Sequence, residues 1–248
     1  MIPNVLHYVY INERPWKIHH YLSVKSALVK AKINEINIWL DSEPSGEWWA
    51  KTKPLVNIIK IKPPTEIFGK EIKEPAHKSD VLRLEILRDH GGIYVDTDVL
   101  FVKPFKDLLD NKFVLGEQGS GGCEGLCPAT ILSEKKSKFS ELWLNGFRDN
   151  FHGGPVGSPT WCLHSVNLPL ALSKKYPDLI TIVNHECFFW PLYHQKHIEI
   201  IFEENHRFPN AYSHHLWESS GKKYLKEMTE EKIRLENTTF TNLVKELV

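Results

Sequence analysis

The first hundred residues alternate between short β-rich runs and longer stretches in which apolar residues recur at helical spacing. Strand-like runs cover residues 5–10, 36–40 and 56–61, and the spacing predicts a helix over residues 15–31. This alternation is typical of an α/β fold in which a mainly parallel sheet is flanked by helices. Ligands of such sheets bind outside the carboxyl ends of the strands, so we expect the functional residues at that edge of the sheet.

The second half of the chain is less regular. A glycine-rich loop covers residues 119–125, a helix is expected over residues 139–147, and residues 151–160 are again rich in glycine and proline. From residue 222 onward the chain is charged and amphipathic, which indicates a C-terminal helical extension.

Charge and hydropathy exclude several classes of protein. Lys+Arg and Asp+Glu both number 31 among the 248 residues, so the net charge is zero and nucleic acid is not an expected partner. We find no apolar run long enough for a transmembrane segment and no signal peptide. We therefore expect a cytoplasmic protein, and leave open peripheral membrane contact through the amphipathic C-terminal stretch.

The most informative segment is residues 77–105. The pattern predicts a helix with Ser79 as its N-cap that ends at two consecutive glycines, followed by a short apolar strand over residues 93–95. Asp80 and Arg83 are three residues apart, so their side chains share one face of this helix.

Two aspartates follow the apolar strand directly. In extended backbone Asp96 and Asp98 point to the same side of the chain. Carboxylate oxygens at a sheet rim suit Mg²⁺ or Mn²⁺, which keep coordination positions open for substrate phosphates. Such an ion would stabilise a departing diphosphate, and Arg83 could contact a phosphate or a sugar hydroxyl.

Other interpretations of this pattern remain open from the residues alone. Two acids one residue apart are also common in surface turns. An aspartate pair after an apolar strand also occurs in haloacid-dehalogenase-like phosphatases, although Leu100 stands where those enzymes have threonine or valine. A non-catalytic module that binds a sugar-nucleotide or a glycan is a third reading. Release of phosphate from an aryl phosphate, and release of nucleoside diphosphate from a sugar donor, distinguish the three.

Residues 77–105 resemble the sugar-binding region of glycosyltransferase family 32, whose pattern is Ser-Asp-x-x-Arg followed by Gly-Gly-x-Tyr-x-Asp-x-Asp. The clostridial glucosylating toxins share this block more distantly. Residues 2–7 are similar to the opening Ile-Pro-Lys-x-Ile-His of the family, and residues 212–219 to its closing His-x-Trp-x-x-Ser. The chain departs from the pattern at Tyr10 and near Gly221, where the family often has tryptophan.

The resemblance implies a GT-A fold, with a Rossmann-like sheet and a smaller acceptor-side region, and a retaining hexosyl transfer from a nucleotide-sugar. The implied ligands of Mn²⁺ or Mg²⁺ are Asp96, Asp98 and His215. The implied donor-binding residues are His7, Tyr8, Asp80, Arg83, Asp96 and Trp217. The residues implied to act in the transfer itself are Asp98, Asp96 and Arg83.

We accordingly expect one domain over residues 1–248, with a nucleotide-sugar-binding half at 1–118, an acceptor-side half at 119–221 and the extension at 222–248. Family habit favours a UDP-sugar as donor, with GDP-mannose as the alternative. The expected acceptor is a glycan or a lipid-linked glycan, in polysaccharide or glycolipid assembly.

Overall fold

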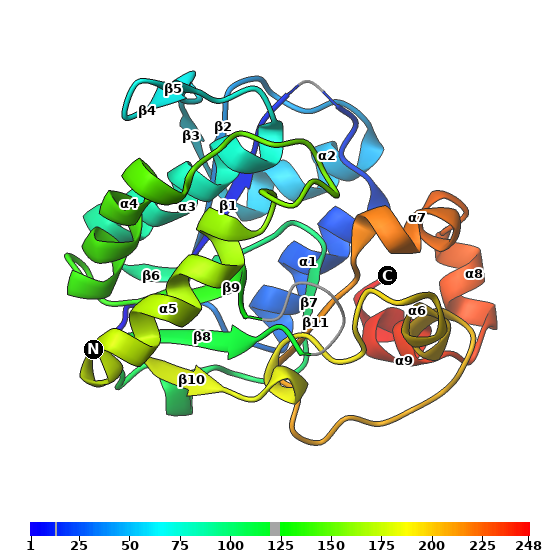
Figure 1. Ribbon diagram of the computed structural model, residues 1–248. Helices are drawn as coiled ribbons and strands as arrows, with labels where there is room; N and C mark the ends of the chain where they lie inside the picture. Colours follow the sequence, from blue (N-terminus) through cyan, green and yellow to red (C-terminus); the bar gives the residue numbers. More distant parts are fainter. Residues whose placement is uncertain (13, 120–124) are drawn as a thin grey trace.

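The computed structural model describes residues 1–12, 14–119 and 125–248. Most of the glycine-rich loop expected at residues 119–125 therefore lies outside the described residues. The centre of the molecule is a seven-stranded sheet (Figure 1). Its strands, in spatial order, are β10 (Thr181–Val183), β8 (Phe113–Glu117), β9 (Leu126–Ser133), β6 (Gly92–Val95), β1 (Val5–Tyr10), β2 (Glu35–Leu40) and β3 (Asn57–Lys60).

Parallel pairing dominates this sheet, as the sequence predicts. Strand β1 pairs in parallel with β2 and β6, β2 pairs in parallel with β3, and β8 with β10. Strand β9 runs antiparallel to both β6 and β8. The α/β class with a mainly parallel sheet is confirmed, and the one reversed strand marks the passage from the first half of the chain to the second.

Helices cover both faces of the sheet, and its inner strands are buried on both sides, whereas the edge strands β3 and β10 are partly exposed. Along β6, Ile93 and Val95 pack into the core on the side of α1 (Ile18–Val29), whereas Tyr94 packs with α3 (Pro75–His90) and α4 (Lys138–Asn150) on the opposite side. Helix α2 (Glu47–Thr52) lies against α1, and α5 (Leu168–Lys175) against α4 (Figure 1). Because side chains alternate along a strand, β6 contributes residues to two separate core layers, one on each face of the sheet.

Helix α3 begins at Pro75, with Glu74 in extended conformation as its N-cap. The prediction that Ser79 caps this helix is therefore wrong. Proline at the first helical position has its φ angle already fixed for a helix and lacks the N–H that would be unpaired there, so it sets the start one turn earlier. Ser79 lies inside the helix, where its hydroxyl is free to contact the neighbouring strand.

A second, two-stranded sheet is formed by β7 (Val99–Phe101) and β11 (Ser213–His215), and a small hairpin by β4 (Glu66–Ile67) and β5 (Lys70–Glu71). Around the small sheet lie α6 (Gln195–Phe202), α7 (Glu218–Lys226), α8 (Glu230–Leu235) and α9 (Thr239–Val244) (Figure 1). Residues 222–248 thus form several short helices, which bury apolar side chains against α1 and β7.

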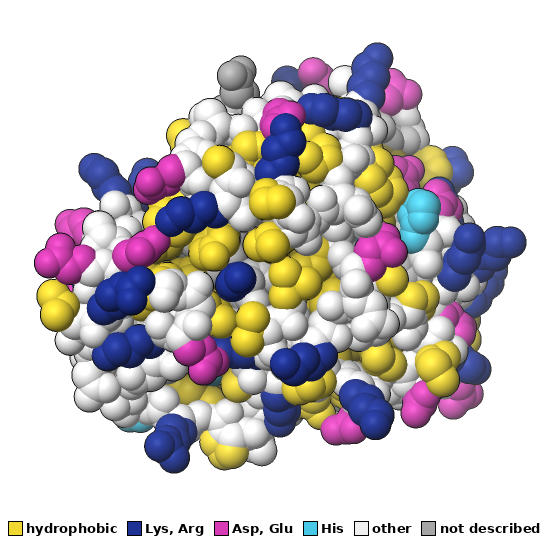
Figure 2. Space-filling view, turned by 180° about the vertical axis from the view of Figure 1, so that it is seen from behind, with side chains coloured by type: hydrophobic (Ala, Val, Ile, Leu, Met, Phe, Trp, Pro, Cys, Tyr) yellow, Lys and Arg dark blue, Asp and Glu magenta, His cyan; other side chains and the backbone are white. Residues whose placement is uncertain are grey.

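The face turned away in Figure 1 carries lysine and arginine side chains scattered among hydrophobic ones (Figure 2). Charge of one sign is not concentrated there, in keeping with the zero net charge of the chain. Within the described part of the chain, none of the helices has the length and apolarity that a membrane crossing requires.

The buried imidazole of His7 makes the protein sensitive to acid. Its Nδ1 accepts a hydrogen bond from the Trp39 indole at 3.2 Å, so Nε2 carries the proton and donates to the carbonyl oxygen of Gly91 at 2.9 Å. Burial lowers the pKa of His7 from 6.5 to about 4. The unfolded chain therefore takes up a proton at higher pH than the folded one, and stability falls as pH drops from 6.5 towards 4.

We expect His7 to account for about 3 kcal/mol of this loss. Urea unfolding at pH 7.5 and pH 4.5 measures it, since His7→Gln should reduce the difference between the two free energies of unfolding. The exposed His152→Gln is the matched control and should leave the difference unchanged. Equal pH dependence in all three proteins would refute the assignment to His7.

Candidate functional site

A cleft of about 510 Å³ lies where β6 leaves the central sheet. Its walls come from the end of β1 and the loop after it, the first turns of α3, residues 94–98, residues 156 and 161, and residues 215–219. Segments far apart in sequence therefore meet at the carboxyl end of the central strands, where α/β folds place their ligands.

The Asp-x-Asp segment forms a turn at this rim. The Val99 N–H donates to the carbonyl oxygen of Asp96 at 3.1 Å, and Thr97 and Asp98 are the turn residues. The prediction that extended backbone brings the two carboxylates to one side is wrong in its reason, because the chain must turn here to pass from the central sheet into β7. The carboxylates nevertheless converge: one ligand atom each from Asp96, Asp98 and His215 lie within 4.8 Å of one another.

His215 reaches the turn through the small sheet. Strands β7 and β11 pair antiparallel with His215 opposite Val99, one residue from Asp98. The Leu216 N–H then donates to the Asp98 carbonyl oxygen at 2.9 Å, which continues the pairing past the strand end. The side chain of His215, 117 residues from Asp98 in sequence, is thus placed beside it by the backbone pairing.

Asp98 and His215 form a buried ion pair. His215 Nε2 lies 3.2 Å from Asp98 Oδ1, and the Glu218 N–H donates to Asp98 Oδ2 at 2.7 Å. Burial disfavours the charged carboxylate, but His215 and the Glu218 N–H outweigh it and lower the pKa of Asp98 to about 2. Burial likewise opposes a charged His215, yet the Asp98 carboxylate raises the pKa of the imidazole above its ordinary value.

These groups fit a divalent cation. Two carboxylates and one imidazole supply oxygen and nitrogen donors, and His215 already places Nε2 towards Asp98. A cation held by these three side chains would replace the imidazolium proton, so its binding would release that proton and leave His215 as a neutral ligand. His215 Nδ1 is buried without a hydrogen-bond partner among the described residues.

Arg83 joins the two acids of the motif region. Its Nη2 lies 3.2 Å from Asp80 Oδ1 and 3.4 Å from Asp96 Oδ1, while Nη1 donates to the carbonyl oxygen of Pro128 at 2.8 Å. The guanidinium packs on the ring of Tyr94 with its carbon 4.6 Å from the ring centre. With 5% of its surface exposed, Arg83 is a buried cation held between two carboxylates and still facing the cleft.

Asp80 does not line the cleft. It is 8% exposed, and its second oxygen lies 3.1 Å from His164 Nε2, in the π-helical turn Leu163–Asn167. Burial disfavours its charged form, but Arg83 and then His164 lower the pKa of the carboxyl below its ordinary value. Asp80 is therefore an ionised side chain outside the cleft that holds the Arg83 guanidinium in place.

Tyr94 orients the other carboxylate. Its hydroxyl donates to Asp96 Oδ1 at 2.7 Å and lies 3.1 Å from the hydroxyl of Ser79, which also meets Arg83. The motif residues from Ser79 to Asp96 therefore form one connected polar network that lines the cleft.

Trp217 lines the cleft in a strained backbone conformation. Its φ is +53°, in the left-handed region, which is costly for a residue with a side chain and commonest at functional sites. The indole N–H donates to the carbonyl oxygen of Pro191 at 3.0 Å, and the ring lies 4.0 Å from the His215 ring, centre to centre. The left-handed residue turns the chain sharply, so that α7 begins directly beside Asp98.

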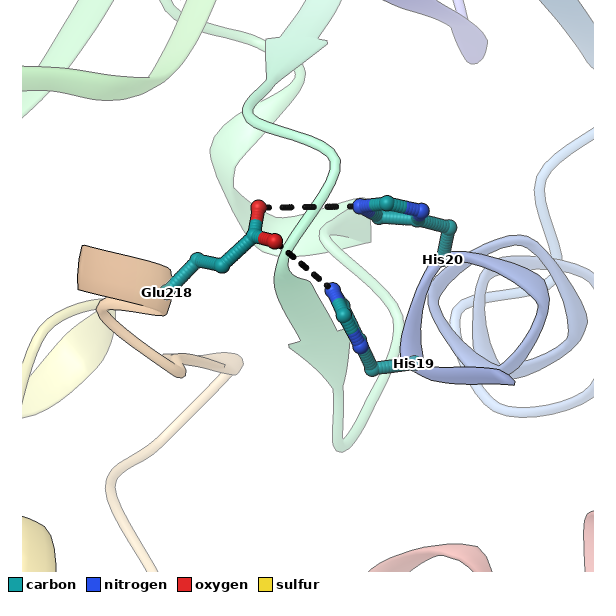
Figure 3. A group of neighbouring side chains, drawn as sticks. All are labelled: His19, His20 and Glu218. Carbon is teal, nitrogen blue, oxygen red and sulfur yellow. Dashed lines mark ion pairs between the residues drawn. The ribbon is translucent and has the colours of Figure 1, made fainter. Parts of the chain in front are cut away.

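Glu218, the first residue of α7, points towards His19 and His20 (Figure 3) and also meets Lys17. Its carboxylate lies 2.8 Å from Lys17 Nζ, 3.6 Å from His19 Nε2 and 3.7 Å from His20 Nε2. Two imidazoles and a carboxylate suggest a second metal site, but His20 Nδ1 accepts the backbone N–H of Lys17 at 3.0 Å. Its Nε2 therefore carries the proton, so we interpret this group as a carboxylate that accepts a hydrogen bond from Lys17 and faces two imidazoles at ion-pair distance.

His7 and Tyr8 lie away from the cleft. His7 is bonded to Trp39 and Gly91 on the α3 side of the sheet, and the fully buried Tyr8 hydroxyl lies 2.9 Å from that of Ser23 in α1. From β1 and the loop after it, the cleft is lined instead by Val9, Ile11, Asn12 and Arg14. His7 and Tyr8, which the family resemblance implies as donor-binding residues, therefore belong to the strand that ends at the cleft and do not line it.

The chain also matches known proteins. A sequence profile described as the glycosyltransferase sugar-binding region containing the DXD motif matches residues 18–115. Glucan organizing enzyme 1 of Cryptococcus neoformans var. grubii is 33% identical over 268 aligned positions, covering 100% of this chain and 71% of that protein. The chain belongs to this glycosyltransferase family.

The glycosyltransferase is also similar to a second sequence relative and to a solved structure. Lactosylceramide 4-alpha-galactosyltransferase of Pongo pygmaeus is 26% identical over 154 positions, covering 56% of this chain and 66% of that protein. Among solved structures, the PaToxG glycosyltransferase superposes with a TM-score of 0.53 at 17% identity, covering 99% of this chain and 87% of that one. At that identity the likeness shows the fold, which is GT-A. The choice between transferase and phosphatase that the Asp-x-Asp pattern left open is answered by the family.

Of the residues at the site that were not predicted from the sequence, three carry much of its charge and shape. Glu218 stands inside the closing motif, and an acid just before the helical extension expected from residue 222 was a usable signal. His164 and Trp161 carry no such signal, because their contacts with Asp80 and the cleft arise only when residues 151–167 fold against α3.

Proposed function

We propose that this glycosyltransferase transfers a hexose, with retention of configuration, from a nucleotide-sugar to a glycan or glycolipid, and that it depends on a divalent cation. The observation that carries the proposal is the convergence of Asp96, Asp98 and His215 within 4.8 Å on the wall of a 510 Å³ cleft. A cleft of this volume is in the range that holds a small ligand.

Asp96, Asp98 and His215 hold the cation in this proposal. When bound, the cation neutralises the diphosphate of the donor and makes it a better leaving group. Carboxylates suit Mg²⁺ and Mn²⁺ equally, but an imidazole ligand favours Mn²⁺ because Mg²⁺ prefers oxygen. We therefore propose Mn²⁺ as the better activator.

The donor sugar lies against Arg83 and Ser79. Arg83 faces the cleft with its remaining N–H groups and is fixed by Asp80 and Asp96, so it meets sugar hydroxyls or a phosphate oxygen without rearranging. In this proposal Asp80 does not contact the donor and only positions Arg83. Trp217 closes the cleft over the diphosphate beside His215.

The transfer breaks the bond between the anomeric carbon and the diphosphate oxygen and forms one to an acceptor hydroxyl. In the proposal the acceptor proton passes to the departing diphosphate oxygen, with no protein base. A UDP-hexose is the favoured donor and GDP-mannose the alternative. The name of the galactosyltransferase relative supports a hexose and a glycolipid acceptor. A cytoplasmic location, with peripheral membrane contact, remains a prediction from the sequence.

Thermal unfolding with a panel of nucleotide-sugars tests the proposal. We expect stabilisation of the folded protein by a UDP-hexose or GDP-mannose when Mn²⁺ is also present, and much less with either alone, because the cation links the carboxylates to the diphosphate. Release of nucleoside diphosphate from the same donor, without an acceptor, separates an enzyme from a binding module. A protein indifferent to every donor in the presence of Mn²⁺ would contradict the proposal.

A further inference from the structure

One wall of the cleft is apolar and is not used by the proposed chemistry. It comes from the segment between α4 and α5, drawn as a light-green coil in Figure 1. From this segment Val156 and Trp161 line the cleft, and Val156 is 74% exposed. A large aromatic side chain and an exposed aliphatic one that line the same cleft indicate a surface that a ligand covers.

The orientation of Trp161 is fixed by its neighbours. Its backbone N–H donates to the carbonyl oxygen of Ser158 at 3.1 Å, and its ring lies 4.6 Å from the ring of His77, centre to centre, at an angle of 38°. His77 is 1% exposed, and burial lowers its pKa, so the imidazole is neutral and serves as a flat packing surface. One face of the indole is thus supported while the side chain remains half-buried at the cleft.

The turn that carries Trp161 lies next to the side chains assigned to the donor sugar and is separate from them. Three residues further on, His164 contacts Asp80, and Asp80 contacts Arg83, which in turn reaches Asp96. These contacts run from Asp96, a proposed cation ligand, through Arg83 and Asp80 to His164. They therefore connect the region assigned to the donor sugar with the turn that carries Trp161. The nucleoside is expected at the other end of the cleft.

We propose that Trp161, together with Val156, forms the acceptor subsite and stacks on a pyranose ring of the acceptor glycan. This rests on the proposed function. A pyranose has one face of C–H groups, which an indole covers well, and a rim of hydroxyls that need polar partners. Glu74, just before α3, lines the same cleft and supplies a carboxylate for those hydroxyls.

The test separates acceptor binding from donor binding. The probe is whichever methyl glycoside or disaccharide, from a panel of glucosides, galactosides, mannosides, lactose and maltose, the wild-type enzyme glycosylates fastest. Trp161→Ala should raise the KM for this acceptor about tenfold or more, because truncating a central tryptophan typically removes much of a binding energy. Trp161→Phe, which keeps an aromatic face, should raise it less.

Donor hydrolysis measured without acceptor should stay within about twofold of wild type in both variants. Val156→Ser should raise the acceptor KM a few-fold, whereas Leu235→Ser, at a similarly exposed aliphatic position (76%) outside the cleft, should not. Because Val156 is exposed, its substitution tests the subsite even if Trp161→Ala unfolds.

Two outcomes would overturn the subsite. An unchanged acceptor KM in Trp161→Ala would show that the acceptor binds elsewhere. A fall in donor hydrolysis as large as the fall in transfer would show that Trp161 holds the donor. Failure of the proposed function is a different result, since the wild-type enzyme would then release no nucleoside diphosphate from any donor.

Discussion

Asp98→Asn is expected to slow sugar transfer about a thousandfold, which corresponds to about 4 kcal/mol of transition-state stabilisation. Asparagine keeps the shape of the side chain and can still accept the Glu218 N–H, which donates at 2.7 Å. It lacks the negative charge that the proposed cation needs. The measurement is the initial rate of nucleoside diphosphate release at saturating donor, as a function of Mn²⁺ concentration.

The matched control for this change is Asp89→Asn. Asp89 is an exposed acid near the end of α3, paired with Arg88, and faces away from the chemistry we propose. Its substitution should leave the rate within about twofold, because surface ion pairs contribute little. Because Asp98 is buried, the midpoint of thermal unfolding of Asp98→Asn is also measured, to show that the variant is folded. A folded Asp98→Asn enzyme with the wild-type rate and Mn²⁺ dependence would rule out Asp98 as a ligand.

Much of the first half of the fold could be predicted from the sequence because its elements are built from local signals. Strand β1 was expected at the residues where it occurs, and β2 to within one residue, since both are uninterrupted β-rich runs. Strands β8 and β9 were not recognised. Strand β9 contains Pro128, which weakens any strand pattern, yet it lies between β6 and β8 and pairs with both. Its place is decided by partners distant in sequence.

The site divides in the same way. Asp80, Arg83, Asp96 and Asp98 could be predicted together because one helix, one strand and one turn deliver them consecutively. His215 could be proposed only by resemblance, since its approach to Asp98 depends on the pairing of β7 with β11. The turn at residues 96–99 was missed because local spacing does not indicate where a strand must leave one sheet for another.

Arg83→Met is expected to destabilise the fold by about 3–5 kcal/mol, because it leaves the buried carboxylate of Asp80 and the partly exposed one of Asp96 without their cation. The guanidinium lies within 3.4 Å of oxygens from both Asp80 and Asp96 and also holds the Pro128 carbonyl. Methionine fills similar volume but satisfies none of these groups. Arg83→Lys should recover little, since one ammonium cannot replace a planar group that meets three acceptors. Urea unfolding at pH 7.5 gives the free energies.

Electrostatics and packing can be told apart in this experiment. If unpaired charge causes the loss, Arg83→Met should become relatively less unstable as pH falls from 7.5 towards 5, because the pKa values of its uncompensated carboxyls rise and the groups take up protons. Adding Asp80→Asn to Arg83→Met should then restore part of the stability at pH 7.5. Arg88→Met, on the exposed end of the same helix, should cost less than about 1 kcal/mol. The loss of stability in Arg83→Met could instead be independent of pH and unaffected by Asp80→Asn. That result would show that Arg83 stabilises the fold by packing on Tyr94, and would contradict the charge network that we propose for the donor site.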